Sequence, residues 1–157
     1  MPEIRFAPRE IFEEILEWSV IPTFDLVIEY GNSGVFILKR SIDPYKNKWA
    51  LPGLRMYKNE EINDSLKRIA KNELSLDIDP NAKILLGQYV GKFKTEHNRQ
   101  DLSTGYLIKV DENKSMKINQ DHFFAYKLIN SKEQIPNNIG AMYKYYLELY
   151  FSSTGRS

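Results

Sequence analysis

The sequence predicts an α+β fold, an α/β/α sandwich in which a mixed β-sheet lies between helices. Two observations support this prediction. Apolar residues recur at helical spacing near both ends and in the middle of the chain, and short β-branched or aromatic runs lie before, between and after them. The 157 residues contain no repeat and no Gly/Ser linker, so we expect a single domain over residues 1–157.

The first third of the chain predicts a helix and a β-hairpin. After Pro8, apolar side chains from Ile11 to Val20 recur at helical spacing, and glutamates take the other face. Two β-branched and aromatic runs follow at 23–30 and 35–40. The four residues between them, Gly-Asn-Ser-Gly, are typical of a hairpin turn, so the two strands are expected to be antiparallel.

The rest of the chain predicts two more helices and three more strands. A helix is expected over 63–74, with Asn63 or Asp64 as its N-cap. The remaining expected elements are strands at 83–89, 104–110 and 123–129, a helix at 139–150 and a disordered polar tail at 152–157.

Composition excludes several classes of function. Lys and Arg number 22 against 21 Asp and Glu, so no overall field favours nucleic acid or anionic lipid. The absence of cysteine excludes disulfides and thiolate zinc sites, and two histidines are too few for a structural zinc centre. No signal-like start or run of roughly 18 apolar residues is present. We therefore expect a cytoplasmic protein without a nucleic-acid or membrane partner.

The most informative stretch runs from residue 51 to residue 73. A strand end is expected to meet a turn at Gly53, and the helix that follows carries Arg68 and Glu73. The loop and this helix face could together surround a small polar ligand. A loop that leads into an ordinary surface helix is the alternative, and spacing alone leaves both open.

This stretch resembles the signature of the Nudix hydrolases. Glu60 and Arg68 stand at the signature interval, Glu73 matches its last carboxylate, and Trp49–Gly53 is similar to the family's lead-in. Arg68 is expected to pair with Glu60 and hold the loop on the helix. The chain departs from the signature at Leu54, Ile69, Asn72 and Ser75. The resemblance implies a Nudix-like fold in which two signature carboxylates are replaced.

The degenerate signature is similar to that of one branch of the family, the GDP-mannose mannosyl hydrolases. The residues that carry this likeness are Phe6, Phe12, Asp25, Lys39–Ser41, Pro52–Arg55, Arg68, Glu73 and Tyr106. The likeness implies a nucleotide-sugar substrate, cleavage at the anomeric carbon of the sugar with inversion, and release of GDP and the free sugar. It also implies a homodimer.

The two missing carboxylates limit the number of metal ions that the site can hold. A single carboxylate cannot hold the two or three divalent cations with which typical family members activate water for attack on phosphorus. The likeness implies instead one Mg2+ held by Glu73, the Gly53 carbonyl and Gln120, with water and phosphate oxygens in its other positions. Such an ion is suited to neutralising the charge of a leaving group.

A diphosphate that departs on Mg2+ and arginine needs no proton, so one general base suffices. Arg40 and Arg55 fit the stabilisation of the leaving group. The family's base is a histidine directly after the metal-binding glutamine, but here Asp121 follows Gln120 and His122 comes one place later. His122 is the first candidate for the base, Asp121 is the second, and an enzyme with altered or lost activity is the third.

The likeness also gives four residues a role in substrate binding. Phe6 and Phe12 would stack on guanine or contact a second subunit, with ordinary packing as the alternative. Asp25, which interrupts an apolar strand, would accept a hydrogen bond from a sugar hydroxyl. Tyr106 would contact the substrate.

Three functions follow as hypotheses. The first is a Mg2+-dependent hydrolase of a nucleoside-diphosphate sugar, with GDP-mannose as the expected substrate and water attacking carbon. The second is a pyrophosphatase that attacks phosphorus of another nucleoside diphosphate derivative. The third is a Nudix-shaped module that binds a nucleotide or a protein partner without catalysis.

Overall fold

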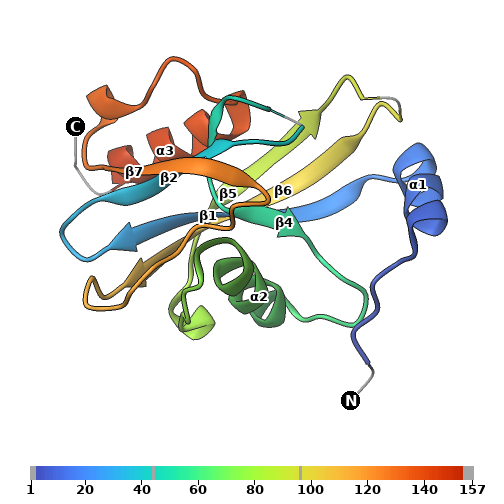
Figure 1. The fold of residues 1–157 in the computed structure, drawn as a ribbon, viewed down its shortest axis with the longest axis horizontal. Helices are drawn as coiled ribbons and strands as arrows, with labels where there is room; N and C mark the ends of the chain where they lie inside the picture. The colour runs from blue at the N-terminus through green and yellow to red at the C-terminus, as the bar shows by residue number, and fades with distance from the viewer. Residues whose placement is uncertain (1–2, 44, 96, 154–157) are drawn as a thin grey trace.

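A mixed sheet forms the centre of the molecule. The computed structural model describes residues 3–43, 45–95 and 97–153. Within them, seven strands form one sheet in the order β3-β2-β1-β6-β5, with β4 paired to β1 and β7 paired to β2 (Figure 1). The strands are β1 (Ile21–Tyr30), β2 (Val35–Arg40), β3 (Trp49–Ala50), β4 (Gly53–Arg55), β5 (Ile84–Lys92), β6 (Gln100–Val110) and β7 (Phe123–Ile129). β1 and β6 are parallel and the other pairs are antiparallel, which confirms the predicted mixed sheet.

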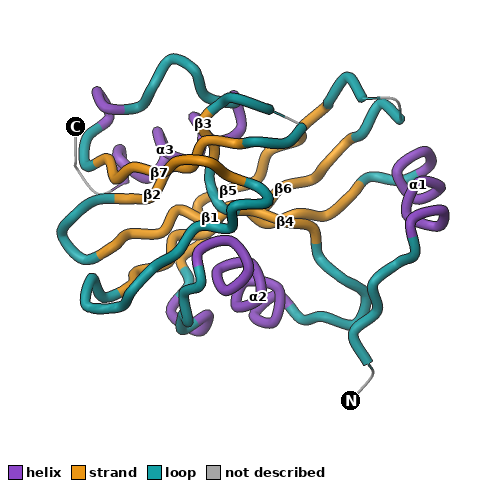
Figure 2. The backbone as a smooth tube through the Cα atoms, viewed as in Figure 1, coloured by secondary structure: helices purple, strands orange, loops and turns teal. Residues whose placement is uncertain are grey.

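One helix covers each face of the sheet (Figures 1 and 2). Leu26 and Ile28 of β1 belong to the core beneath α2 (Ile62–Leu74), whereas Val27 belongs to the core beneath α3 (Ala141–Ser153). All three side chains are fully buried because both faces of the strand are covered. The predicted α/β/α sandwich is therefore confirmed. No helix in the described ranges has the length and apolarity needed to cross a membrane.

The start of α2 differs from the prediction. Glu61 is the N-cap, and neither Asn63 nor Asp64 takes that position. Asp64 is the third helical residue, and its carboxylate accepts a hydrogen bond from the Glu61 backbone N–H at 2.9 Å. This is one half of a capping box, so Asp64 still satisfies a free donor at the helix start.

The remaining helix, α1 (Arg9–Trp18), stands beside the sheet and covers neither face (Figure 1). It contains no buried residue, and Trp18 is 82% exposed. The segment before it is tied to the loop after β4, because the Arg5 N–H donates to the Lys58 carbonyl at 3.1 Å. The N-terminal segment thus reaches the loop that leads into α2.

The other expected elements are present with shifted ends. β2 and β7 match the predicted bounds, whereas β5 and β6 are longer than predicted. Gly53 was expected in a turn but begins β4, where it pairs with Asp25 of β1. β3 and β4 are too short to show a sequence period. α3 continues to Ser153, so the first two residues of the expected tail at 152–157 are helical, and residues 154–157 lie outside the described residues.

Two short 3-10 helices complete the chain. These are η1 (Pro80–Ala82), which precedes β5, and η2 (Lys132–Gln134), which follows β7. The Asp79 side chain accepts a hydrogen bond from the Asn81 N–H at 3.0 Å and so caps η1.

Candidate functional site

A cavity of about 180 Å³ brings together residues from both helical layers and the sheet between them. Glu73 comes from α2, Tyr143 comes from α3 and His122 comes from the turn before β7. Strands β1, β2 and β4 contribute the rest of the predicted residues. The residues predicted for the site that line this cavity are Asp25, Arg40, Gly53, Arg55, Glu73 and His122. Asp25 and His122, which are far apart in the sequence, therefore line the same cavity, as the resemblance implied.

The other five predicted site residues lie outside the cavity lining. Tyr106 is buried in the α2-side core, where its ring lies 6.1 Å from that of Phe24. Gln120 and Asp121 are exposed on the turn before β7. Phe6 and Phe12 lie against the side chain of Arg55.

Glu73 and His122 form the polar pair of the cavity. Glu73, in the last turn of α2, is 1% exposed. The Nδ1 atom of His122 lies 2.9 and 3.1 Å from its two carboxylate oxygens. An ionised carboxylate only accepts, so Nδ1 is the donor and Nε2 holds the free electron pair when the ring is neutral. The hydrogen bond that His122 donates to Glu73 raises the pKa of His122, and burial opposes this rise.

Backbone contacts fix His122 on this side of its loop. The Asn119 N–H donates to the Glu73 carbonyl at 2.9 Å, and the His122 N–H donates to the Asn119 carbonyl at 3.1 Å. The Ser41 N–H donates to the His122 carbonyl at 2.8 Å. The loop is thereby fastened to the end of α2 and to the end of β2, and His122, one place after the position expected from the family, reaches the cavity.

The donors at this position suit a single hard cation. Among the described residues, no group of three or more His, Asp or Glu side chains is placed to hold a metal ion. The Glu73 carboxylate and the Gly53 backbone line the same cavity, and oxygen donors of this kind fit a Mg2+ that keeps waters and phosphate oxygens in its other positions. A Cβ on Gly53 would lie 2.1 Å from Oδ1 of Asp25, so only glycine allows this close approach.

Asp25 is a buried carboxyl group beside the metal-ligand candidates. It is 4% exposed, and its Oδ2 accepts a hydrogen bond from the Ser103 hydroxyl at 2.5 Å. Burial is the main cause that raises the pKa of Asp25 to about 7, and the charge of Asp101 adds to it. The hydrogen bond from Ser103 and the charges of Arg40 and Arg99 act in the opposite direction.

Three further cavity residues were missed by the sequence analysis. Arg99 donates from Nε to Oδ1 of Asp101 at 2.8 Å, and both side chains line the cavity with Thr23. Burial raises the pKa of Asp101, although Arg99 opposes the rise. Asp101 lies in β6, which was predicted to begin only at residue 104. The sequence offered no usual strand signal here, because Asp101 and Ser103 are buried and Leu102 between them is exposed, the reverse of the common apolar-inside alternation.

Three aromatic rings surround the guanidinium of Arg55. Its central carbon lies 3.8 Å from the ring centre of Phe12, 5.0 Å from that of Phe6 and 5.2 Å from that of Tyr57. These distances are in the range of cation–π attraction. The N-terminal segment and α1 therefore position the arginine that lines the cavity.

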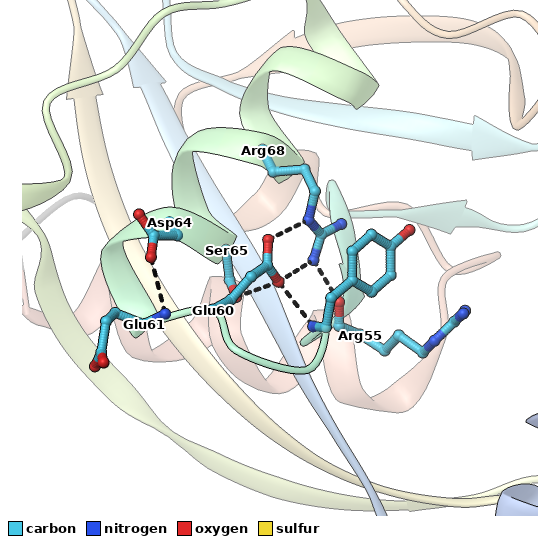
Figure 3. Close-up of polar contacts among 7 residues, drawn as sticks. Arg55, Glu60, Glu61, Asp64, Ser65 and Arg68 are labelled. Carbon is cyan, nitrogen blue, oxygen red and sulfur yellow. Dashed lines mark hydrogen bonds and ion pairs between the residues drawn. The ribbon is translucent and has the colours of Figure 1, made fainter. Parts of the chain in front are cut away.

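A buried ion pair holds the loop between β4 and α2 (Figure 3). Arg68 donates to both carboxylate oxygens of Glu60, at 2.6 and 2.8 Å, and to the backbone carbonyl of Arg55 at 2.7 Å. Glu60 also accepts from the Ser65 hydroxyl at 2.9 Å and from the Tyr57 N–H at 2.7 Å. The predicted Arg68–Glu60 pairing is confirmed. Burial alone would raise the pKa of Glu60, but these hydrogen bonds outweigh burial and lower it.

Comparisons with known proteins are consistent with this geometry. No protein-family model matches the sequence. The curated low-salt glycan biosynthesis protein Agl8 of Haloferax volcanii is 27% identical over 110 residues, which cover 67% of this chain and 69% of that protein.

Solved structures identify the fold. A MutT Nudix hydrolase from Burkholderia pseudomallei matches with a TM-score of 0.72 at 16% identity, over 83% of this chain and 98% of that one. The Nudix domain of Shewanella oneidensis NrtR, solved with ADP ribose, matches with a TM-score of 0.69 at 14% identity, over 95% and 94%. A MutT/Nudix family protein from Enterococcus faecalis matches at 0.60 and 19% identity, over 79% of this chain and 56% of that one. The chain has the fold of these proteins.

The first prediction concerns the ion pair in the loop before α2. We expect Glu60→Gln to lower the free energy of unfolding at pH 7 by about 3 kcal/mol, because it leaves the Arg68 guanidinium without its carboxylate. The folded pKa of Glu60 is lowered from 4.5, so the stabilisation is present above that value and is lost as pH falls through the lower folded pKa. Urea unfolding of both proteins from neutral to acid pH measures the difference.

The matched control is Asp77→Asn. Asp77 pairs with Lys71 at 3.5 Å on the surface, and its removal is expected to cost less than about 0.5 kcal/mol. The ion pair would not be what holds the loop if Glu60→Gln cost no more than this control, or if its cost stayed constant down to acid pH.

Proposed function

We propose that this chain, with its Nudix fold, is a Mg2+-dependent hydrolase of a nucleoside-diphosphate sugar, and that GDP-mannose is its substrate. The observation that carries the proposal is the composition of the cavity. The buried carboxylate of Glu73 lies with His122 and with the cations Arg40 and Arg55, and no group of three or more His, Asp or Glu side chains in the described residues is placed to hold several metals. This set suits the departure of a diphosphate better than the assembly of several metals on an attacking water.

Two similar proteins support the substrate class. The NrtR Nudix domain was solved with ADP ribose, a nucleoside diphosphate joined to a sugar. The relative from Haloferax volcanii is named for glycan biosynthesis. The cavity, at about 180 Å³, is smaller than the roughly 300–1,000 Å³ of pockets that bury whole drug-sized ligands, so we assign it to the sugar and phosphates and place the nucleoside outside it.

In the proposed reaction, the water oxygen forms a bond to the anomeric carbon, and the bond from that carbon to the diphosphate oxygen breaks. GDP leaves with the electron pair, and the water gives its proton to a base. His122 is suited to be this base, because its Nδ1 donates to Glu73 and its Nε2 is the atom left to accept a proton. Asp121, exposed on the same turn, is the second candidate.

The leaving diphosphate requires positive charge. Arg40 and Arg55 line the cavity and can hydrogen-bond phosphate oxygens, and the aromatic rings around Arg55 restrict its motion. Mg2+, when bound by Glu73 and the Gly53 carbonyl, would supply further charge neutralisation at the diphosphate. Phe6, exposed beside Arg55, would be the ring on which the nucleobase stacks.

The products test the proposal. With GDP-mannose and Mg2+ we expect GDP and free mannose, and in water enriched in oxygen-18 we expect the label in the sugar, because water attacks carbon. Mass spectrometry of the separated products measures both. GMP with mannose 1-phosphate would indicate attack on phosphorus, and unchanged substrate would indicate a binding module, so either result would contradict the proposal.

Two substitutions test the assigned roles. Glu73→Gln is expected to abolish the dependence of rate on Mg2+ concentration and most turnover, because the ion loses its charged ligand. His122→Gln is expected to lower kcat by about 10²–10⁴ with a modest change in KM. Steady-state kinetics over a range of Mg2+ concentrations measures both. If Asp121→Asn lowers kcat and His122→Gln does not, the base is Asp121.

We also propose that the protein is a homodimer that uses α1. Ile11, Ile15 and Trp18 of this helix are exposed, although together they form a continuous apolar face. A second copy of the chain would bury this face, and each Å² of apolar surface removed from water contributes roughly 25 cal/mol. The Phe12 contact with Arg55 would link such an interface to the cavity.

Light scattering after size exclusion measures the oligomeric state. We expect a dimer for the wild-type chain and a monomer for Trp18→Glu, because the new charge would lie inside the interface. Glu13→Gln, on the opposite face of the same helix, is the control and should remain dimeric. A monomeric wild-type protein, or a dimer unaffected by Trp18→Glu, would contradict the assignment.

A further inference from the structure

Part of the cavity lining has a chemistry that is unsuited to a phosphate. Thr23 and Asp25 of β1 lie beside Asp101 of β6, because the parallel register pairs Ile21 with Asp101 and Asp25 with Gly105. Arg99 precedes β6 and also lines the cavity. We call these four residues, Thr23, Asp25, Arg99 and Asp101, the polar floor. Its two carboxyl groups disfavour a second anion next to them.

An unpartnered hydroxyl points to a missing ligand at the polar floor. Thr23 is 7% exposed, and its Oγ1 has no hydrogen-bond partner among the described residues. Buried polar groups in folded proteins are nearly always hydrogen-bonded, so an unpaired hydroxyl in a cavity wall needs a partner from outside the chain. The neighbouring residue in the pairing, Ser103, already donates to Asp25 and accepts from the Tyr146 hydroxyl.

The rest of the polar floor is held in place. Asp101 accepts from Arg99 at 2.8 Å, and Asp25 accepts from Ser103 at 2.5 Å. Each carboxyl is thus oriented by one donor and keeps acceptor capacity, because a carboxylate has about four lone-pair sites. Several oriented acceptors, an arginine and an unpaired hydroxyl are complementary to a neutral molecule that carries several adjacent hydroxyl groups.

We propose that the polar floor recognises the sugar hydroxyls of the nucleotide-sugar substrate, with Asp101 and Thr23 as residues that determine which sugar is accepted. This inference rests on the proposed function for the class of substrate. It goes beyond that proposal by naming the side chains that select the sugar, and it does not depend on which bond is cleaved.

Binding measurements test this inference. Calorimetry in Mg2+ with GDP and GDP-mannose is carried out in a His122→Gln background, which slows turnover. Thr23→Val and Asp101→Asn are each expected to weaken GDP-mannose binding by about tenfold and to change the Kd of GDP less than twofold. Thr23→Ser keeps the hydroxyl and should retain wild-type affinity. Asp111→Asn, exposed at the end of β6, is the control and should bind both ligands normally.

Thermal unfolding separates recognition from folding. Since the Thr23 hydroxyl has no hydrogen-bond partner in the part of the chain that the structure describes, Thr23→Val should not lower Tm, even though it lowers the affinity for GDP-mannose. A loss of Tm with equal weakening of GDP and GDP-mannose would make Thr23 a structural residue and overturn the inference. Unchanged affinities for both ligands in Thr23→Val and Asp101→Asn would overturn it as well.

The two proposals fail in different ways. If GDP-mannose is hydrolysed to GDP and mannose but the floor variants bind normally, the function holds and the floor assignment is wrong. If the floor variants lose affinity for GDP-mannose alone but no hydrolysis occurs, the floor assignment holds and the enzymatic proposal is wrong. If GDP-mannose binds no more tightly than GDP to the unsubstituted floor, the floor assignment is wrong.

Discussion

The buried pair between Glu60 and Arg68 is the interaction on which the site depends. It joins the loop after β4 to the second turn of α2, and Arg68 also holds the backbone carbonyl of Arg55. Residues on both sides of this ion pair line the cavity, with Arg55 before Glu60 in the chain and Glu73 after Arg68 in the last turn of α2. Because Arg68 also lies over the ring of Tyr57, at 3.6 Å, the aromatic environment of Arg55 is fixed by the same side chain. The pair therefore sets the position of a cation and of a carboxylate at once.

The buried carboxylate of Glu73 has two possible partners. In this structure both of its oxygens lie within hydrogen-bond distance of His122 Nδ1, and it lines the same cavity as the Gly53 backbone. A cation bound there would share this carboxylate with the histidine. In many metal sites one carboxylate hydrogen-bonds and orients a histidine while a different one binds the metal, and here the Glu73 side chain is in reach of both roles. One carboxylate that serves both the metal and the histidine is consistent with a reaction that needs one ion and one base.

Much of the fold was predictable, because long periodic elements are properties of the sequence. The spacing of Glu60, Arg68 and Glu73, together with the family resemblance, selected six residues that line the cavity. What was missed depends on tertiary contacts. β4 has only three residues, and it forms because it pairs with β1. Asp101 becomes a site residue only through the parallel pairing of β1 with β6. The aromatic rings at Phe6 and Phe12 were assigned to substrate or subunit contacts, but within this chain they meet Arg55. No spacing rule predicts a contact between a terminal segment and a strand.

The pairing of Asp25 with Gly53 joins the two halves of the cavity. Asp25 belongs to the polar floor, whereas Gly53 stands with Glu73 at the position assigned to the ion. The absence of a side chain at Gly53 lets the carboxyl of Asp25 lie against the backbone of β4, where a Cβ would be 2.1 Å away. In the proposed function, the sugar lies on the polar floor and the diphosphate lies beside Arg40 and Arg55. The bond between sugar and diphosphate then lies near the pairing of Asp25 with Gly53. A substrate held rigidly on both sides has its scissile bond placed by the two strands themselves, which is the geometric condition for a single base to suffice.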